Sequence, residues 1–83
     1  MDSKRLKLIA LRKERNMFQK DVVYLLKHLY GIEITESYYG MIEQGVRTPK
    51  LDIALGIAKL FNVPLEEIFF GKQPNKKLGS KTA

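Results

Sequence analysis

The stretch Thr35–Gly45, TESYYGMIEQG, has the pattern of a short helix with one thin apolar stripe and one chemically varied face. Thr35 is a favourable N-cap, because its hydroxyl can accept a hydrogen bond from a free backbone N–H group. Tyr39 and Ile42 lie three residues apart and therefore share a face. Gly45 suits the left-handed conformation that commonly follows a helix. Such a helix is poorly suited to filling a core, so we expect its polar face to contact a partner.

A longer helix is expected ahead of this stretch, from Phe18 or Gln19 to about Tyr30. Its apolar residues recur with helical spacing, and Gly31 supplies a left-handed stop. Phe18 cannot cap the helix, so the first backbone N–H groups stay open to water or to an anion. Residues 32–34 then form a short extended connector. The residues expected to face the core are Val22, Val23, Leu26, Leu29 and Tyr30.

Three further helices complete the expected architecture. The first runs from the caps Asp2 and Ser3 to about Arg15, the fourth from Leu51 to about Phe61, and the last from Leu65 to about Phe70. Apolar residues occupy most sides of the fourth, Leu51 and Leu55 among them, so we expect it to be the most buried helix. Apolar and polar residues nowhere alternate long enough to predict a strand. The expected fold class is therefore all-α, a compact bundle of five short helices.

The composition restricts the classes of function. A chain of 83 residues without cysteine makes one small domain with neither disulfides nor thiolate metal sites. His28 is the single histidine and cannot build a histidine metal cluster. Neither a nucleophile–base set nor a glycine-rich phosphate loop is present, so we expect no enzyme and no cofactor. No apolar run approaches the roughly 18 residues of a membrane span, and no signal pattern opens the chain. We therefore expect a cytoplasmic protein without membrane contact.

The net charge of +6 is unevenly distributed along the chain. Residues 72–83 hold four lysines and no acidic residue, and we expect them to form a flexible basic tail after a folded domain at 1–71. The rest of the chain carries 11 basic and nine acidic residues. Because the folded part is only mildly basic, nucleic-acid binding would require a local basic patch.

The five expected helices resemble the Xre/Cro/CI-type helix-turn-helix family, that of phage-repressor-like DNA-binding domains. The similarity covers about residues 6–70, and its four segments follow one another in the same order. They are Leu11–Met17; Gln19 with Val22 and Val23; Tyr39, Ile42–Gly45 and Arg47–Pro49; and Leu51, Ile57–Val63 and Leu65–Phe69. The resemblance implies a lambda-repressor-like bundle whose helix at 35–44 enters the major groove of DNA.

The same resemblance implies roles for individual residues. The positions that meet base edges are Glu36, Ser37 and Met41, and those that meet the DNA backbone are Gln19, Tyr38, Arg47 and Lys50. A glutamate can accept from cytosine N4, serine is permissive, and methionine can pack on a thymine methyl group. Glu36 is equally well explained as a first-turn charge that favours the helix dipole without touching a base. Both interpretations of Glu36 remain open.

Arg12 and Glu43 align with a family pair that forms a largely buried salt bridge between helices one and three. Such a bridge would hold the recognition helix at a fixed angle. The interval from Gln19 to Glu43 is several residues longer than is usual in the family, and the surplus falls around residues 27–33. The second helix and its connector are therefore expected to be extended, which affects how the third helix is aimed.

The leading hypothesis is a sequence-specific regulator of transcription that binds double-stranded DNA, repressor-like and acting as a homodimer on a two-fold operator. In this family the dimer contact often uses the last helices, where Phe69 and Phe70 are adjacent. The rival hypothesis is an antitoxin or adaptor-type module that uses the same fold to bind a protein partner. The mild charge of the folded part and the acidic Glu36 favour this rival.

Overall fold

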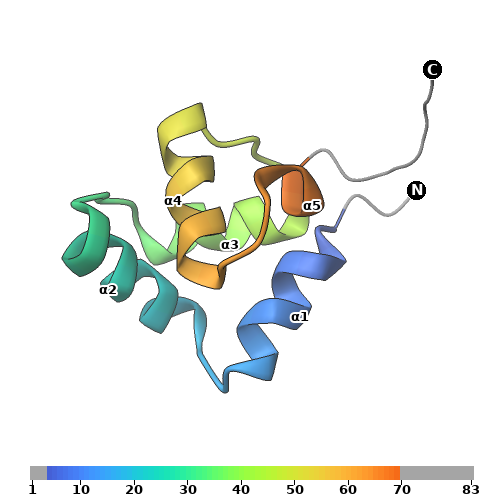
Figure 1. The fold of residues 1–83 in the computed structure, drawn as a ribbon, viewed down its shortest axis with the longest axis horizontal. Helices are drawn as coiled ribbons and strands as arrows, with labels where there is room; N and C mark the ends of the chain where they lie inside the picture. Colours follow the sequence, from blue (N-terminus) through green and yellow to red (C-terminus); the bar gives the residue numbers. More distant parts are fainter. Residues whose placement is uncertain (1–3, 70–83) are drawn as a thin grey trace.

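The computed structural model describes residues 4–69, in which five α-helices follow one another and no strand occurs (Figure 1). The helices are α1 (Leu6–Glu14), α2 (Gln19–Tyr30), α3 (Glu36–Gln44), α4 (Leu51–Phe61) and α5 (Leu65–Phe69). The all-α class and the number of helices expected from the sequence are confirmed for this part of the chain. The expected domain end at residue 71 and the expected tail at 72–83 lie outside the described residues.

Local signals set most of the helix ends. Thr35 caps α3, because its Oγ1 accepts a hydrogen bond of 3.0 Å from the backbone N–H of Tyr38. Gly45 follows α3 with φ at 80°, and Gly31 follows α2 with φ at 68°. Asn62 takes the same left-handed conformation after α4, with φ at 57°. These four ends agree with the sequence expectation.

The expected start of α1 is wrong. Asp2 and Ser3 lie outside the described residues, and the residue at the N-cap position of α1 is Arg5. The backbone N–H of Arg5 donates to the carbonyl oxygen of Glu43 at 2.8 Å. This long-range bond fixes the chain against α3 before α1 begins, a constraint that the residues around Arg5 do not reveal.

The N-terminus of α2 is capped from within the helix. Phe18 occupies the N-cap position without a side-chain bond of its own, and its ring is 68% exposed. The Asp21 carboxylate instead accepts a 2.7 Å hydrogen bond from the backbone N–H of Phe18. Asp21 thus places a negative charge in the first turn, where it also favours the helix dipole.

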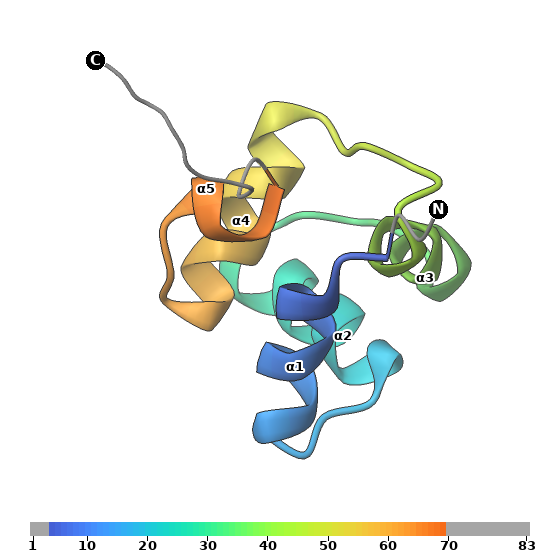
Figure 2. The same cartoon turned by 90° about the vertical axis from the view of Figure 1, so that its right-hand side faces the viewer.

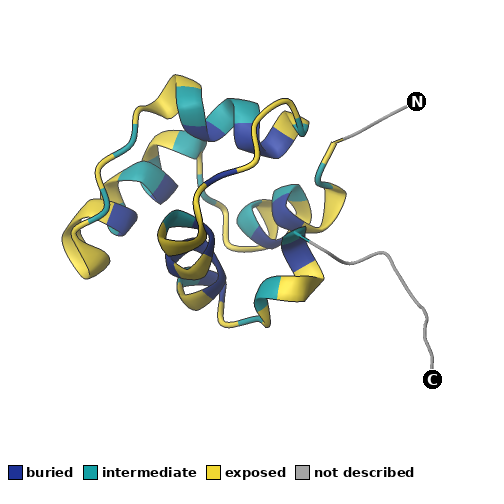
Figure 3. Cartoon of the chain, turned by 90° about the horizontal axis from the view of Figure 1, so that it is seen from above, coloured by how far each residue is buried: buried dark blue, intermediate teal, exposed yellow. Residues whose placement is uncertain are grey.

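The hydrophobic core lies where the five helices meet. α2 packs against α3 and α4, α4 packs against α5, and α1 packs against α3 and α5. The buried side chains of the core are Leu8, Leu11, Val22, Leu26, Tyr39, Ile42, Ile57, Ala58, Phe61 and Ile68. Figure 3 shows these buried positions on the inward sides of the helices. α4 contributes more buried residues than any other helix, as expected.

The last turn of α2 departs from the expected pattern, because Leu29 and Tyr30 are exposed rather than buried. The chain turns back at Gly31, and Ile32 packs against the core in their place. Ile32 reaches α4 at Gly56, where an added Cβ atom would overlap Ile32 Cδ1. The longer connector is therefore accommodated by a glycine in the buried helix, since any larger residue at position 56 would displace Ile32.

Two leucines of α4 were also expected to face the core and do not. Leu51 is 64% exposed and Leu55 is 42% exposed, whereas Ala54, Ile57 and Phe61 are buried. The buried side of α4 is the one that faces α2 and α5, and the two leucines lie beyond its edge. An outward apolar face thus remains on this helix.

Candidate nucleic-acid interface

The side of α3 that points away from the core carries the residues expected to meet bases. Glu36 and Ser37 are exposed and Met41 is half-buried, all within this one helix. In Figure 2, α3 lies at the edge of the molecule, and the segment 45–50 leads from it to α4. Gln44 is also exposed at helical spacing from Ser37 and Met41, so it belongs to the same face. The sequence analysis did not include Gln44, although its spacing placed it there.

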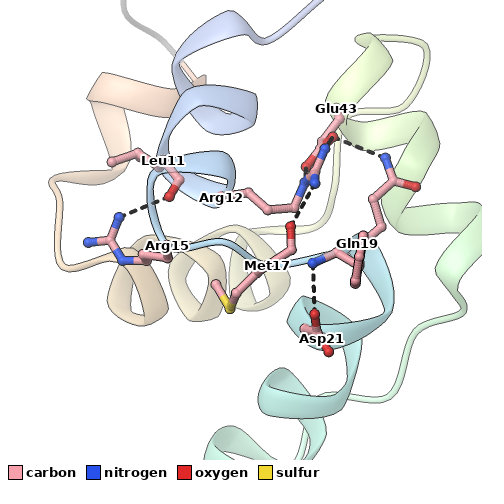
Figure 4. Close-up of polar contacts among 8 residues, drawn as sticks. Leu11, Arg12, Arg15, Met17, Gln19, Asp21 and Glu43 are labelled. Carbon is pink, nitrogen blue, oxygen red and sulfur yellow. Dashed lines mark hydrogen bonds and ion pairs between the residues drawn. The ribbon is translucent and has the colours of Figure 1, made fainter.

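The opposite side of α3 is held by a buried ion pair. Arg12 Nε lies 2.6 Å from Glu43 Oε2, and Arg12 Nη2 lies 3.0 Å from Glu43 Oε1 (Figure 4). This fork-to-carboxylate geometry is the strongest form of a side-chain ion pair. The Glu43 side chain is only 1% exposed. The salt bridge implied by the family resemblance is therefore present, and it joins α1 to α3.

The same carboxylate also binds α2. Gln19 Nε2 donates to Glu43 Oε1 at 3.0 Å, while Arg12 Nη1 donates to the carbonyl oxygen of Met17 at 2.9 Å (Figure 4). A Cβ atom at Gly40 would lie 3.2 Å from Gln19 Oε1, so the amide group is seated closely against α3. Glu43 thus joins three helices and holds the first turn of α2 against α3.

The charges in this cluster stabilise one another. Burial raises the pKa of Glu43, whereas hydrogen bonds from Arg12 and Gln19 and the charge of Arg12 lower it. The lowering effects together are larger, so the pKa of Glu43 is below its usual value. The hydrogen bond to Glu43 raises the pKa of Arg12. Both groups therefore remain ionised at neutral pH.

Tyr39 completes the buried side of α3. Its hydroxyl is buried and has no well-aligned hydrogen-bond partner among residues 4–69. Burial, followed by the neighbouring Glu43 carboxylate, raises the pKa of Tyr39, so the hydroxyl stays protonated. The core thus contains a protonated phenol beside an ionised carboxylate.

The residues expected to meet the DNA backbone fall into two groups. Arg47 and Lys50 are exposed in the segment between α3 and α4, where their cations are accessible to a phosphate. Tyr38 and Gln19 are half-buried. Tyr38 packs partly against the core, and the Gln19 amide nitrogen donates to Glu43. The structure thus brings Gln19 to α3 through a contact that the sequence analysis did not anticipate.

Arg5 is the residue of this region that the sequence analysis missed. Its Nη1 donates to the carbonyl oxygens of Ile42 at 2.6 Å and Arg47 at 3.0 Å, which joins the end of α3 to the following segment. The guanidinium lies 5.1 Å from the centre of the Phe69 ring, a cation–π distance. Burial lowers its pKa. No local pattern reveals this role, because all of these partners are far along the chain.

Comparison with known proteins identifies the fold. The helix-turn-helix family matches residues 26–68, just over half of the chain, and the chain belongs to this family. The resemblance to the Xre/Cro/CI type is thereby confirmed. The chain is similar to the cryptic phage CTXphi transcriptional repressor RstR of Vibrio cholerae, at 32% identity over 77 residues that cover 90% of this chain and 64% of that protein. It therefore spans slightly less than two thirds of the relative's length. No solved structure matches the chain.

Two kinds of feature are absent from residues 4–69. No helix there is long and apolar enough to cross a membrane. The same residues contain no group of three or more histidine, cysteine or acidic side chains that could hold a metal ion.

Proposed function

We propose that this protein is a sequence-specific regulator of transcription that binds double-stranded DNA and acts as a repressor. It works in the cytoplasm as a homodimer on a two-fold operator and is not an enzyme. Glu36, Ser37 and Met41 read base edges in the major groove. Its contacts to the DNA backbone come from Gln19, Tyr38, Arg47 and Lys50.

One observation carries this proposal above the others. α3 exposes Glu36 and Ser37 and leaves Met41 half-buried beside them, while its buried Glu43 is bound by both α1 and α2. A recognition helix must keep a fixed angle to the rest of the domain, because base contacts require side chains placed to within a fraction of an ångström. The family membership and the similarity to a phage repressor support the same function.

Duplex DNA binding across a salt series tests the proposal. Lysine and arginine side chains that contact phosphates release the counterions bound to DNA. We therefore expect the logarithm of the binding constant to fall linearly with the logarithm of salt concentration. Arg47→Ala should weaken binding to all sequences and reduce that slope by about 1. Lys27→Ala is the matched control, because Lys27 lies in the last turn of α2 and pairs with Glu33 at 3.5 Å. No binding to any duplex at low salt would refute the function.

Base-reading variants separate specific from general binding. Ser37→Ala and Met41→Ala should change the order of preferred sequences selected from a random duplex pool, with the salt slope unchanged. Arg47→Ala should leave that order intact. If the α3 variants weaken every sequence equally, then α3 does not read bases.

A protein partner is the second candidate, favoured by the exposed acidic Glu36 on α3. A carboxylate repels phosphate but suits a basic peptide surface. Glu36→Gln separates the two functions. If the protein binds DNA and Glu36 weakens binding to non-cognate sequences, the variant should bind non-cognate duplexes more tightly than wild type. For an antitoxin or adaptor, duplex binding is absent in both forms.

A further inference from the structure

The outward side of α4 has the features of an interaction surface. Leu55, which is 42% exposed, lies between Asp52 and Lys59 at helical spacing. These three residues line a groove whose other wall comes from Tyr30 and residues 31–33. Leu55 and Lys59 also line a second groove that continues towards the turn between α4 and α5. We name the surface of Leu51, Asp52, Leu55, Lys59 and Asn62 the outer α4 face.

The charges of this face have no partners in the described part of the molecule. Asp52 lies in the first turn of α4 and Lys59 in its last turn. The ion pairs found among residues 4–69 join Lys7 to Glu67, Arg12 to Glu43 and Lys27 to Glu33, and neither Asp52 nor Lys59 takes part in one. An apolar centre flanked by one acidic and one basic residue is thus exposed to solvent.

This arrangement is complementary to itself. If two α4 helices pack antiparallel about a two-fold axis near Leu55, each Asp52 lies opposite the Lys59 of the other copy. A two-fold contact requires one surface to match itself in this way. We propose that the outer α4 face binds a second copy of this chain, with the Leu55 side chains in contact and two Asp52–Lys59 pairs at the ends. The inference specifies the surface of the homodimer given under Proposed function and rests on it.

The last helix is a weaker candidate for the dimer contact. Phe69 is half-buried and already lies beneath the Arg5 guanidinium. Phe70 lies outside the described residues. The outer α4 face, in contrast, carries two exposed apolar side chains, Leu51 and Leu55.

The size of the surface indicates a weak dimer. α4 has 11 residues and is therefore about 16 Å long. A contact made by this one short helix buries less surface than the roughly 800 Å² on each partner that is typical of stable dimers. Two copies bound to adjacent half-sites are held at a high effective concentration, which converts a weak contact into cooperative binding. We therefore expect self-association of the free chain only at high concentration.

Charge reversal tests the proposal through a mixing experiment on the full chain. Asp52→Lys makes the face wholly basic, and Lys59→Asp makes it wholly acidic. Each variant alone should self-associate about tenfold more weakly than wild type, because both end pairs become repulsive. An equimolar mixture should recover association, because the two altered faces complement each other. Sedimentation velocity at concentrations up to about 1 mM measures all three samples.

Two further variants complete the design. Leu55→Ser should weaken association without a change of charge. Leu6→Asp is the control for a new charge at an exposed leucine, since Leu6 is 65% exposed on α1 and should leave association unchanged. Circular dichroism verifies that each variant is folded. If a charge variant is unfolded, Leu55→Ser decides whether the outer α4 face mediates self-association. A monomeric wild type, a mixture that stays monomeric, or a control that weakens association equally would each overturn the proposal.

Binding to a duplex with a single half-site separates this inference from the proposed function. Leu55→Ser, which leaves the charge unchanged, should bind one half-site as wild type does but lose cooperativity on a paired site. If no variant and no wild-type protein binds DNA, the regulator function fails, whatever the sedimentation result. If half-site binding is intact and association is absent, only the outer α4 face is refuted.

Discussion

At the scale of single residues, the Glu43 carboxylate connects three helices. It accepts hydrogen bonds from Arg12 of α1 and Gln19 of α2 while standing on α3. The net stabilisation from a buried ion pair is often small, because desolvation offsets the attraction between the charges. Removing one partner is costly nonetheless, since it leaves the other charge buried alone. The pair therefore matters most for the geometry that it enforces.

Glu43→Gln should lower the free energy of unfolding by about 3–5 kcal/mol at pH 7, because it leaves Arg12 without its counter-charge. The pKa of Glu43 in the folded protein is below its usual value. Its contribution is therefore fully present above the unfolded-state pKa of about 4.3 and disappears as the pH falls through the folded-state value. The difference between wild type and variant should shrink as the pH decreases below about 4.

Urea unfolding at a series of pH values measures this difference. Glu66→Gln is the control, because Glu66 is exposed in the first turn of α5. A wild-type advantage over Glu43→Gln that is equal at neutral and acidic pH would show that the ionised carboxylate is not its source. The absence of any advantage at pH 7 would show that the buried pair does not constrain the fold.

At the scale of elements, the extended connector and α4 are matched to each other. Ile32 packs where α4 carries Gly56, and it occupies space that a side chain at position 56 would need. Glycine within a helix normally costs about 1 kcal/mol relative to alanine. Its presence in the middle of the most buried helix is explained by the close approach of Ile32.

Gly56→Ala in the wild type requires Ile32 Cδ1 to move aside, and this shift should offset part of the gain in helix propensity. In the Ile32→Val background, which lacks that Cδ1 atom, the same change should stabilise the protein by up to about 1 kcal/mol. The other atoms near an added Cβ, Leu26 Cδ2 and Ile32 Cγ1, lie 3.7 Å and 3.8 Å away, at ordinary contact distances. Thermal unfolding of the four proteins measures the effect. An equal effect of Gly56→Ala in both backgrounds would contradict the prediction.

At the scale of the whole molecule, the arrangement determines which surface can meet DNA. The outward side of α3 and the cations Arg47 and Lys50 follow one another in the chain and are exposed. Arg5 joins the two regions by binding both the end of α3 and the carbonyl oxygen of Arg47. The Arg5 side chain, which is assigned to neither base nor phosphate contact, would therefore fix the base-reading side of α3 relative to the phosphate-contacting segment.

Sequences selected from a random duplex pool should contain two inverted copies of one short half-site. Their centres should be about 10–10.5 base pairs apart, or a multiple of that, because two recognition helices must enter the same face of the duplex. Sequencing the bound pool measures the spacing directly. A single asymmetric site in the selected pool would show that the protein binds as a monomer.

Several features were predictable from the sequence because they depend on neighbouring residues. Thr35 caps α3 through an N–H group three residues away, and Gly31, Gly45 and Asn62 end helices through their own backbone conformation. The spacing of Tyr39 and Ile42 correctly indicated which side of α3 is buried. The family resemblance indicated the Arg12–Glu43 pair, which no local pattern does.

Other features were decided only by the tertiary structure. Leu29 and Leu55 have the same apolar character as Leu26, yet they are exposed, because burial depends on which element lies opposite. The contacts of Arg5 and Gln19 were likewise unpredictable, since their partners lie more than 20 residues away. The sequence by itself determined the helices, most of their ends and the family. The fold alone decided which sides of α2 and α4 remain uncovered and how α3 is held, because long-range packing is specified by the whole chain.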